Sequence, residues 1–518
     1  MQIPFNATIL FVSSMLGSQP SIPLYESPLF ESPLFESLLF ESSIRESAQS
    51  ERAGSPAAPR PSGAQAISAK ALRAHVEFLA SDELEGRGLG SPGLALAAAY
   101  LAEQLKAAGL EPAGDDGTFL QAVEFEEPVY AAQPEMSLVE DGGQRSALTY
   151  AVDFRVYRPA PGGKFDLLLL GEDSDLPEGL SPSTLLCFPD SRRGKVVRWL
   201  KEQGHPGAEG LAGIVTFMNR EGEPTDQIPR SGRIALKSSG VVSQPLWLEL
   251  SPEVRTKIVS GLVDSIEVNT HFEIKAVLSH NVIGRLPSKQ DGARPELAKQ
   301  AVVVSAHFDH IGMVKGEGRP GPNGEAPDLI NNGADDDASG VSTILEIARV
   351  LAAEGPQERE VLFLIATAEE IGIIGTKYYL EHPSTPLERT VANLNFEMVG
   401  RPDPKAGGPG RLWLSGAERT NLMEAFLANE FMIVADPYPS QDFFTRSDNI
   451  EFCYRGIVGQ TFSTFNLHSD YHRVTDEIEL IDFEHMQSCA IAGLQAVRLV
   501  ADGTIDPEWL PGGMPQPR

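Results

Sequence analysis

The chain has 518 residues, enough for about three domains, and its 42% hydrophobic and 7% aromatic residues are typical of a globular protein. The formal net charge of -30 excludes nucleic acid or an anionic membrane surface as the main partner, because both would repel it. Three scattered cysteines permit at most one disulfide and no thiolate zinc site. The sequence contains no run of about 18 apolar residues, so it predicts no membrane-spanning helix. The oligomeric state stays open.

The first predicted segment, residues 1–66, has three parts. Residues 8–17 are apolar, as in the core of an export signal, although no Lys or Arg precedes Arg45. A five-residue repeat with one glutamate per copy follows, and its period fits neither a helix nor a strand. Ser, Ala, Pro and Gly dominate residues 49–66, which predicts a linker. We expect an exported protein, periplasmic or extracellular.

The remaining chain divides by its hydrophobic pattern. Residues 67–125 begin with helical periodicity on both sides of a Gly-rich loop, and residues 126–278 carry short strand-like runs. In residues 279–503 strands and helices alternate, which predicts an α/β fold with a mostly parallel mixed sheet flanked by helices. Residues 504–518 form a tail. Ligands of such folds bind beyond the carboxyl ends of the strands.

The apolar run at 301–306 predicts a buried strand, and the sequence HFDH comes directly after it. His307 and Asp309 are two residues apart, so both point to the same side of an extended chain, as a metal ligand and its supporting carboxylate do. The sequence GADDDASG at 333–340 comes before a predicted helix. Its aspartates fit helix capping, but a carboxylate there can also bridge two cations.

Acidic residues also come after the next two predicted strands. Glu369 and Glu370 point to opposite sides, so one can bind a metal while the other acts as a general base toward water; a solvated turn is the alternative. Glu397 lies among apolar residues, where an ionised carboxylate needs a cation or a hydrogen-bond donor. A later loop adds His468 and His472. Together, two histidines and three carboxylates suit two zinc ions with open positions for water.

The motifs HFD, GADDDASGV, AEEIG, NFEMVG and YHRVTD, in this order, resemble the dizinc exopeptidase family that includes secreted bacterial aminopeptidases, glutamate carboxypeptidase and the transferrin-receptor ectodomain. The similarity covers Leu72 to about Val500 and begins with LRAHVEFLASDELEGRGLGSPG. It implies a catalytic domain of the zinc-exopeptidase type, split between residues 67–125 and 279–503. Residues 126–278 are similar to the protease-associated domain that many members insert there.

The resemblance also implies a role for each site residue. His307 and Glu397 would bind one zinc, and Glu370 and His472 the other. The Asp336 carboxylate would bridge the two zinc ions, and the peptide bond between Asp336 and Asp337 would be cis. Glu369 would be the general base, and Asp309 would orient His307. Tyr471 would donate a hydrogen bond to the oxyanion. The sequence departs from many relatives at two positions, with Glu397 in place of Asp and Asn449 in place of His.

The predicted function is hydrolysis of N-terminal residues from peptides by a two-zinc aminopeptidase. The absence of GxSxG, HExxH and GxxxxGK[ST] motifs leaves serine-hydrolase, single-zinc and nucleotide-dependent mechanisms unsupported. Two alternatives stay open. The first is a carboxypeptidase or a glutaminyl-cyclase-like enzyme on the same site, and the second is a metal-free binding protein like the receptor relatives.

Overall fold

The computed structural model describes residues 67–516, apart from 141, 158–159, 178–180, 203–211, 219–224, 226–233, 240–245, 291–293 and 315–325. The predicted export signal, repeat and linker lie outside the described residues. Within the described ranges, no helix combines the length and the apolar character that a membrane span requires. Cys187, Cys453 and Cys489 are all buried and free, so the disulfide that the sequence permitted is not formed.

Among the described residues, ten strands form one sheet in the order β17-β16-β18-β15-β13-β14-β12-β2-β9, with β1 paired to β12. Its strands are β1 (Glu111–Pro112), β2 (Leu120–Tyr130), β9 (Ala235–Leu236), β12 (Phe272–Leu286), β13 (Ala301–His307), β14 (Glu360–Ala366), β15 (Thr390–Phe396), β16 (Leu412–Leu414), β17 (Ile433–Ala435) and β18 (Val458–Ser463).

The centre of this sheet is parallel and fully buried. β13 lies parallel to β14 and β15, β15 lies parallel to β18, and every residue of β13 and β14 is buried. Strands covered on both faces need continuous apolar runs, which the two segments supply. The other side of the sheet gives it its mixed character, because β12 pairs antiparallel with both β14 and β2. β2 alternates between buried and more exposed residues, the pattern of an antiparallel strand with one wet face.

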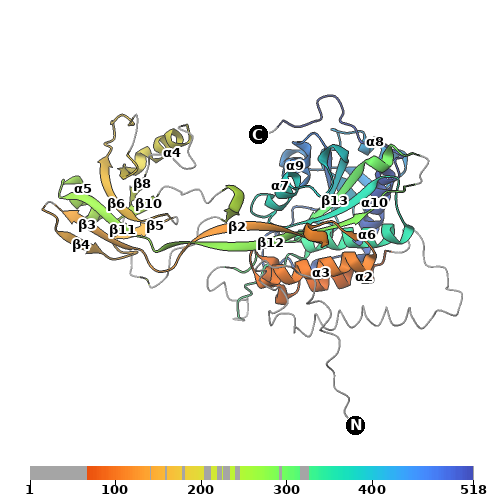
Figure 1. Ribbon diagram of the computed structural model, residues 1–518, viewed down its shortest axis with the longest axis horizontal. Coiled ribbons are helices and arrows are strands. Elements are labelled where there is room, and N and C mark those ends of the chain that lie inside the picture. The colour runs from red at the N-terminus through yellow and green to blue at the C-terminus, as the bar shows by residue number, and fades with distance from the viewer. Residues whose placement is uncertain are drawn as a thin grey trace, which may run out of the picture. The chain divides into compact units, whose positions relative to one another are not determined.

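Helices cover both faces of the sheet (Figure 1). They are α2 (Ala69–Leu79), α3 (Pro92–Ala108), α6 (Gly340–Glu354), α7 (Ile374–Glu381), α8 (Leu422–Ala428), α9 (Asn449–Cys453) and α10 (Phe483–Ala501). α6 packs against β13 and β15 and also against α2, α3 and α10. The face predicted for α6, with Val341 and Leu345 among its members, is buried. The α/β class with flanking helices is therefore confirmed.

Residues 135–269 contribute a second sheet, of eight strands among those described, in the order β4-β3-β11-β6-β7-β8-β10-β5. Its strands and helices are β3 (Glu135–Glu140), β4 (Arg145–Leu148), β5 (Phe154–Val156), β6 (Gly163–Leu169), β7 (Thr184–Cys187), α4 (Arg193–Glu202), β8 (Gly213–Phe217), β10 (Leu246–Leu250), α5 (Pro252–Val259) and β11 (Val263–Asn269). β2 and β12 lead into and out of this region, pair with each other, and run through residues 125–126 and 278–279.

Candidate metal centre

The carboxyl ends of the central parallel strands bring the predicted site residues to one edge of the ten-stranded sheet. His307, the last residue of β13, lies opposite Ala366 of β14, and Ser305 lies opposite Asn395 of β15. The chain segments that come after β13, β14 and β15 therefore leave the sheet at the same level. This register is the reason that residues more than 60 positions apart in the sequence meet.

One group of neighbouring side chains consists of His307, Asp336 and Glu397, whose nitrogen and oxygen atoms lie within 4.8 Å of one another. His307 Nε2 is 3.3 Å from Asp336 Oδ1. The other ring nitrogen of His307, Nδ1, is 3.1 Å from the main-chain oxygen of Asp309, which fixes the ring orientation and leaves Nε2 facing the group.

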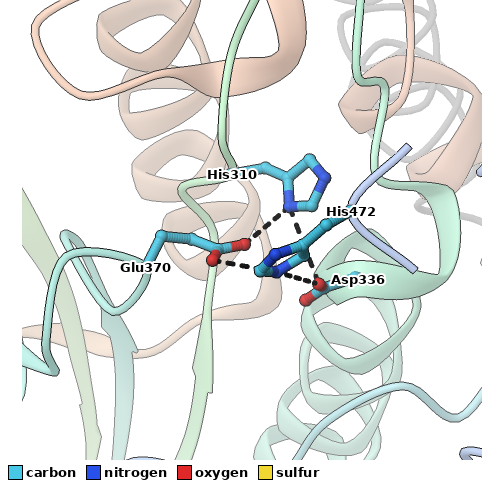
Figure 2. A group of neighbouring side chains, drawn as sticks. All are labelled: His310, Asp336, Glu370 and His472. Carbon is cyan, nitrogen blue, oxygen red and sulfur yellow. Dashed lines mark hydrogen bonds and ion pairs between the residues drawn. The ribbon is translucent and has the colours of Figure 1, made fainter. Parts of the chain in front are cut away.

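A second group contains Asp336, Glu370 and His472 together with His310, again within 4.8 Å of one another (Figure 2). His472 Nε2 is 3.1 Å from Glu370 Oε2 and 3.3 Å from Asp336 Oδ2. His310 Nδ1 is 2.7 Å from Glu370 Oε1. The five residues predicted as ligands thus lie in two groups that share Asp336, and His310 is an addition that the sequence reasoning missed.

The three adjacent aspartates before α6 have different tasks. Asp336 directs one carboxylate oxygen to each group, and its peptide bond to Asp337 is cis, as predicted. Asp337 Oδ1 accepts main-chain N–H groups of Gly340 and Met398, so it caps α6 and anchors the segment after β15. Asp335 accepts the N–H of Gly400. The capping interpretation of the acidic run is therefore confirmed for Asp337, and Asp336 is the aspartate that lies between the two groups.

Asp309 supports the site by a different contact from the one expected. Its carboxylate oxygens accept the main-chain N–H groups of Glu369, at 3.0 Å, and Glu370, at 3.3 Å. Asp309 Oδ1 is 3.9 Å from His307 Nδ1, beyond hydrogen-bond distance, so its main-chain oxygen is the closer contact of that ring. The Asp309 carboxylate thus holds the two glutamates in place.

Several carboxylates in and beside the two groups are buried. Burial raises the pKa of Glu397 to about 7, and it raises the pKa of Glu369 well above the ordinary value, with Glu397 adding to the effect while His307 opposes it. Asp336 Oδ2 and Glu397 Oε2 are buried and accept no hydrogen bond from the described residues. A buried ionised oxygen that accepts no hydrogen bond is costly, so Glu397 Oε2 fits metal binding, and so does Asp336 Oδ2, which faces ring nitrogens of His472 and His310.

The loop before α10 supplies two more predicted residues with different positions. The Tyr471 ring stacks on His472, with 3.9 Å between ring centroids, and also contacts Phe465. Burial raises the pKa of Tyr471, which keeps its hydroxyl a hydrogen-bond donor. His468 lies outside both groups, because its Nε2 is 3.1 Å from Asp335 Oδ2. His468 therefore supports the aspartate loop.

A pocket opens beside Glu397 and Tyr471. The empty space between its walls is about 420 Å³, a figure that includes solvent at the mouth. Aromatic residues form much of its wall, namely Trp413, Phe443, Phe465 and Tyr471, and Arg446 lies with its guanidinium carbon 5.0 Å from the Phe443 ring centroid. Asn449 lies elsewhere, with its amide nitrogen donating to the Phe444 main-chain oxygen.

Comparison with known proteins agrees with this geometry. Residues 281–497 match the family described as Peptidase family M28. Aminopeptidase YwaD of Bacillus subtilis is 29% identical over 54% of this chain and 55% of its own length. The probable lipoprotein aminopeptidase LpqL of Mycobacterium tuberculosis is 26% identical over 61% and 56%. The chain thus matches little more than half the length of these relatives.

A solved aminopeptidase from Aneurinibacillus sp. strain AM-1 shares the fold. Its TM-score is 0.50 at 19% identity, over 85% of this chain and 95% of the other. With the family match, this confirms the resemblance that the motifs indicated. The residues of both metal groups, from His307 to His472, lie within the matched range 281–497.

Proposed function

We propose that this chain is a zinc-dependent aminopeptidase that removes N-terminal residues from peptides. The observation that carries the proposal is the pair of ligand groups joined by Asp336, because a shared carboxylate is what two neighbouring cations require. His307 and Glu397 would hold one zinc, and Glu370 and His472 the other. Retention of all these residues argues against a metal-free binding protein.

Two zinc ions supply Lewis-acid chemistry, since they lower the pKa of a bound water and polarise a carbonyl group. The chain supplies the proton transfer. Glu369 lies beside the two groups without being a member of either, and its N–H is held by Asp309. Burial raises the pKa of Glu369 and so makes its carboxylate a stronger base, and we assign that carboxylate to take the proton from water and give it to the departing amine. Tyr471 would donate a hydrogen bond to the developing oxyanion.

The charges around the site favour a substrate with a free α-ammonium group over one with a terminal carboxylate. Glu397 lines the pocket, and besides burial the charges of Glu397 and Asp448 both raise the pKa of Glu369. Recognition of a terminal carboxylate calls for several cations in a bidentate arrangement. Arg446 is the cation among the described pocket residues. An aminopeptidase is therefore preferred over a carboxypeptidase.

The decisive experiment uses one peptide in four forms with the full-length protein and added zinc: unmodified, N-acetylated, C-amidated, and both. An aminopeptidase cleaves the unmodified and amidated forms and fails on both acetylated forms. Cleavage of the acetylated peptide with a free carboxyl end would instead establish a carboxypeptidase. Closure of an N-terminal glutamine to pyroglutamate on the intact peptide, with release of ammonia, would establish the cyclase alternative. Zinc content, measured by mass spectrometry, should be two per chain.

We propose further that residues 126–278 form an inserted domain of the protease-associated type, between the two parts of the catalytic domain at 67–125 and 279–503. Two observations support this division. The eight-stranded sheet lies within this range, and β2 and β12, which lead into and out of the region, pair with each other. We also propose that the protein is exported. Cell fractionation with an antibody to the full chain tests this, and retention in the cytoplasm would contradict it.

A further inference from the structure

We infer that His310 is a positioning residue that holds Glu370 in place as a zinc ligand, an inference that rests on the proposed function. His310 is absent from the ligand set that the motifs imply. Its ring is fully buried against the second group, and its Nδ1 lies 2.7 Å from Glu370 Oε1 and 3.8 Å from Asp336 Oδ2. It therefore acts as either a further metal ligand or a hydrogen-bond donor to a ligand.

Distances between the atoms distinguish these two roles. Two ligands of one tetrahedral zinc, with bonds of about 2.0–2.1 Å, are about 3.3 Å apart. The pairs of His472 Nε2 with Asp336 Oδ2, at 3.3 Å, and with Glu370 Oε2, at 3.1 Å, have this spacing. The 2.7 Å between His310 Nδ1 and Glu370 Oε1 is short for two ligands but normal for an N–H donor to a carboxylate.

The two oxygens of Glu370 are used separately. Figure 2 shows Glu370 between two histidines, with Oε1 directed to His310 and Oε2 directed to His472. A hydrogen bond to Oε1 fixes the rotation of the carboxylate and leaves Oε2 free for the metal. His310 Nε2 has no hydrogen-bond partner among the described residues, so the ring makes its polar contact through Nδ1.

Packing holds the His310 ring in this orientation. The His472 ring contacts it edge to face, with 5.6 Å between centroids and 71° between planes. Gly333, with φ of 57°, lies on another side, where an added Cβ would come 2.7 Å from His310 Cδ2. The main-chain N–H of His310 is bonded to the oxygen of Arg87 at 3.1 Å. Little freedom is left for the donor to turn away from Glu370.

The test measures zinc binding to full-length variants in a series of chelator buffers, without any peptide substrate. His310→Leu removes the donor, whereas His310→Asn keeps an N–H near the place of Nδ1. We expect His310→Leu to lower the affinity for the zinc held by Glu370 and His472, called the second zinc, about 10–100-fold. The affinity for the zinc held by His307 and Glu397 should not change. In His310→Asn, the affinity for the second zinc should stay within about threefold of the wild-type value. Glu370→Gln, which removes a ligand of the second zinc, shows which of the two binding steps in the chelator series belongs to that zinc.

His485→Asn is the matched control, since His485 is equally buried but accepts the N–H of Gly410 away from the site. When cobalt replaces zinc, its absorption spectrum reports the ligand geometry at the site of the second zinc. Of His310→Leu and the control, only His310→Leu should change this spectrum. Unchanged affinity in His310→Leu would overturn the inference. Equal loss in His310→Asn and His310→Leu would also overturn it, in favour of direct ligation. A wild type that binds no zinc would instead overturn the proposed function itself.

Discussion

The two sheets of this protein share a parallel core but differ in the residues at which their strands end. In the eight-stranded sheet, β6, β7, β8 and β10 are mutually parallel, and Phe188 comes directly after β7 and Met218 directly after β8. In the ten-stranded sheet, β13 ends in His307, and Glu397 comes directly after β15. Both metal groups found among the described residues come from the ten-stranded sheet and its loops.

This difference shows that the arrangement of strands does not create a site by itself. Parallel strands bring the residues at their carboxyl ends to one edge, but chemistry requires polar side chains there that the chain alone cannot satisfy. Phe188 and Met218 join the packing of their region, since both are buried. Glu397 has a buried oxygen without a partner among the described residues. Function should therefore respond to changes at one edge, and stability to changes in both sheets.

The largest expected effect sharpens this contrast at the catalytic edge. Glu369→Gln should lower turnover of an N-terminal peptide substrate by a factor of about 10² to 10⁴, because proton transfer is lost. Both zincs should remain, since Glu369 belongs to neither metal group. Zinc content and turnover are measured together, with Glu370→Gln as the control that should weaken one metal. A fully active Glu369→Gln enzyme would show that the base is another residue.

The second prediction concerns the core of the eight-stranded sheet. Leu248 in β10 is fully buried, so Leu248→Ala should lower the free energy of unfolding of that region by about 2–5 kcal/mol. The zinc content of the folded protein should not change. Denaturant unfolding and zinc analysis check both statements. Leu262→Ala is the control, because Leu262 is 56% exposed and should change stability by less than about 0.5 kcal/mol. Zinc loss in Leu248→Ala would break the comparison.

A third prediction separates a carboxylate that the protein neutralises itself from those that need metal. Glu346 on α6 is buried, yet Arg349 donates to both of its oxygens at 2.7 Å, and His75 lies 3.8 Å away. Burial alone would raise the pKa of Glu346, but the hydrogen bonds from Arg349 and the attraction of nearby His75 outweigh it and bring the pKa to about 2.

The sign of the pH effect is set by this lowered pKa. Glu346 stabilises the folded state above its unfolded pKa of about 4.5, and the stabilisation is lost as the pH falls toward 2. Glu346→Gln should therefore cost up to about 3 kcal/mol at pH 7 and much less at pH 3. Unfolding is measured in chelator, so that zinc release does not contribute, and zinc content at pH 7 should equal that of the wild type. A difference independent of pH would contradict the ion pair.

The sequence predicted the buried strands and helices of the ten-stranded sheet well, because continuous apolar runs and helical periodicity mark burial directly. It could not predict the long pairing of β2 with β12, which joins segments about 150 residues apart. It also could not settle directions at the site. Ala368 and His472 have positive φ, at 56° in each case, so the alternation along a strand does not continue through them.

The same limit explains the residues whose roles changed or were missed. Asp309 and His310 lie beyond the last residue of β13, where strand geometry no longer fixes which side chain faces which partner. The second histidine of HFDH was the only signal for His310. The role of His310 is inferred from its 2.7 Å contact with Glu370, a residue 60 positions away in the sequence.

The smallest expected effect concerns the choice of substrate at the same edge. Arg446 lines the pocket with Phe443 and Trp413, so the walls suit an apolar side chain while the guanidinium disfavours a cationic one. Arg446 is exposed, and charge interactions at exposed sites are worth about 0.2–1 kcal/mol. Arg446→Gln should therefore raise kcat/KM for an N-terminal arginine relative to leucine by about 1.5–5-fold. Arg446→Lys keeps the charge and should leave this ratio unchanged. Because salt screens exposed charges, the wild-type and Gln ratios should converge near about 1 M salt. A ratio that is equal in all three enzymes at low salt would show that the first side chain of the substrate binds away from Arg446.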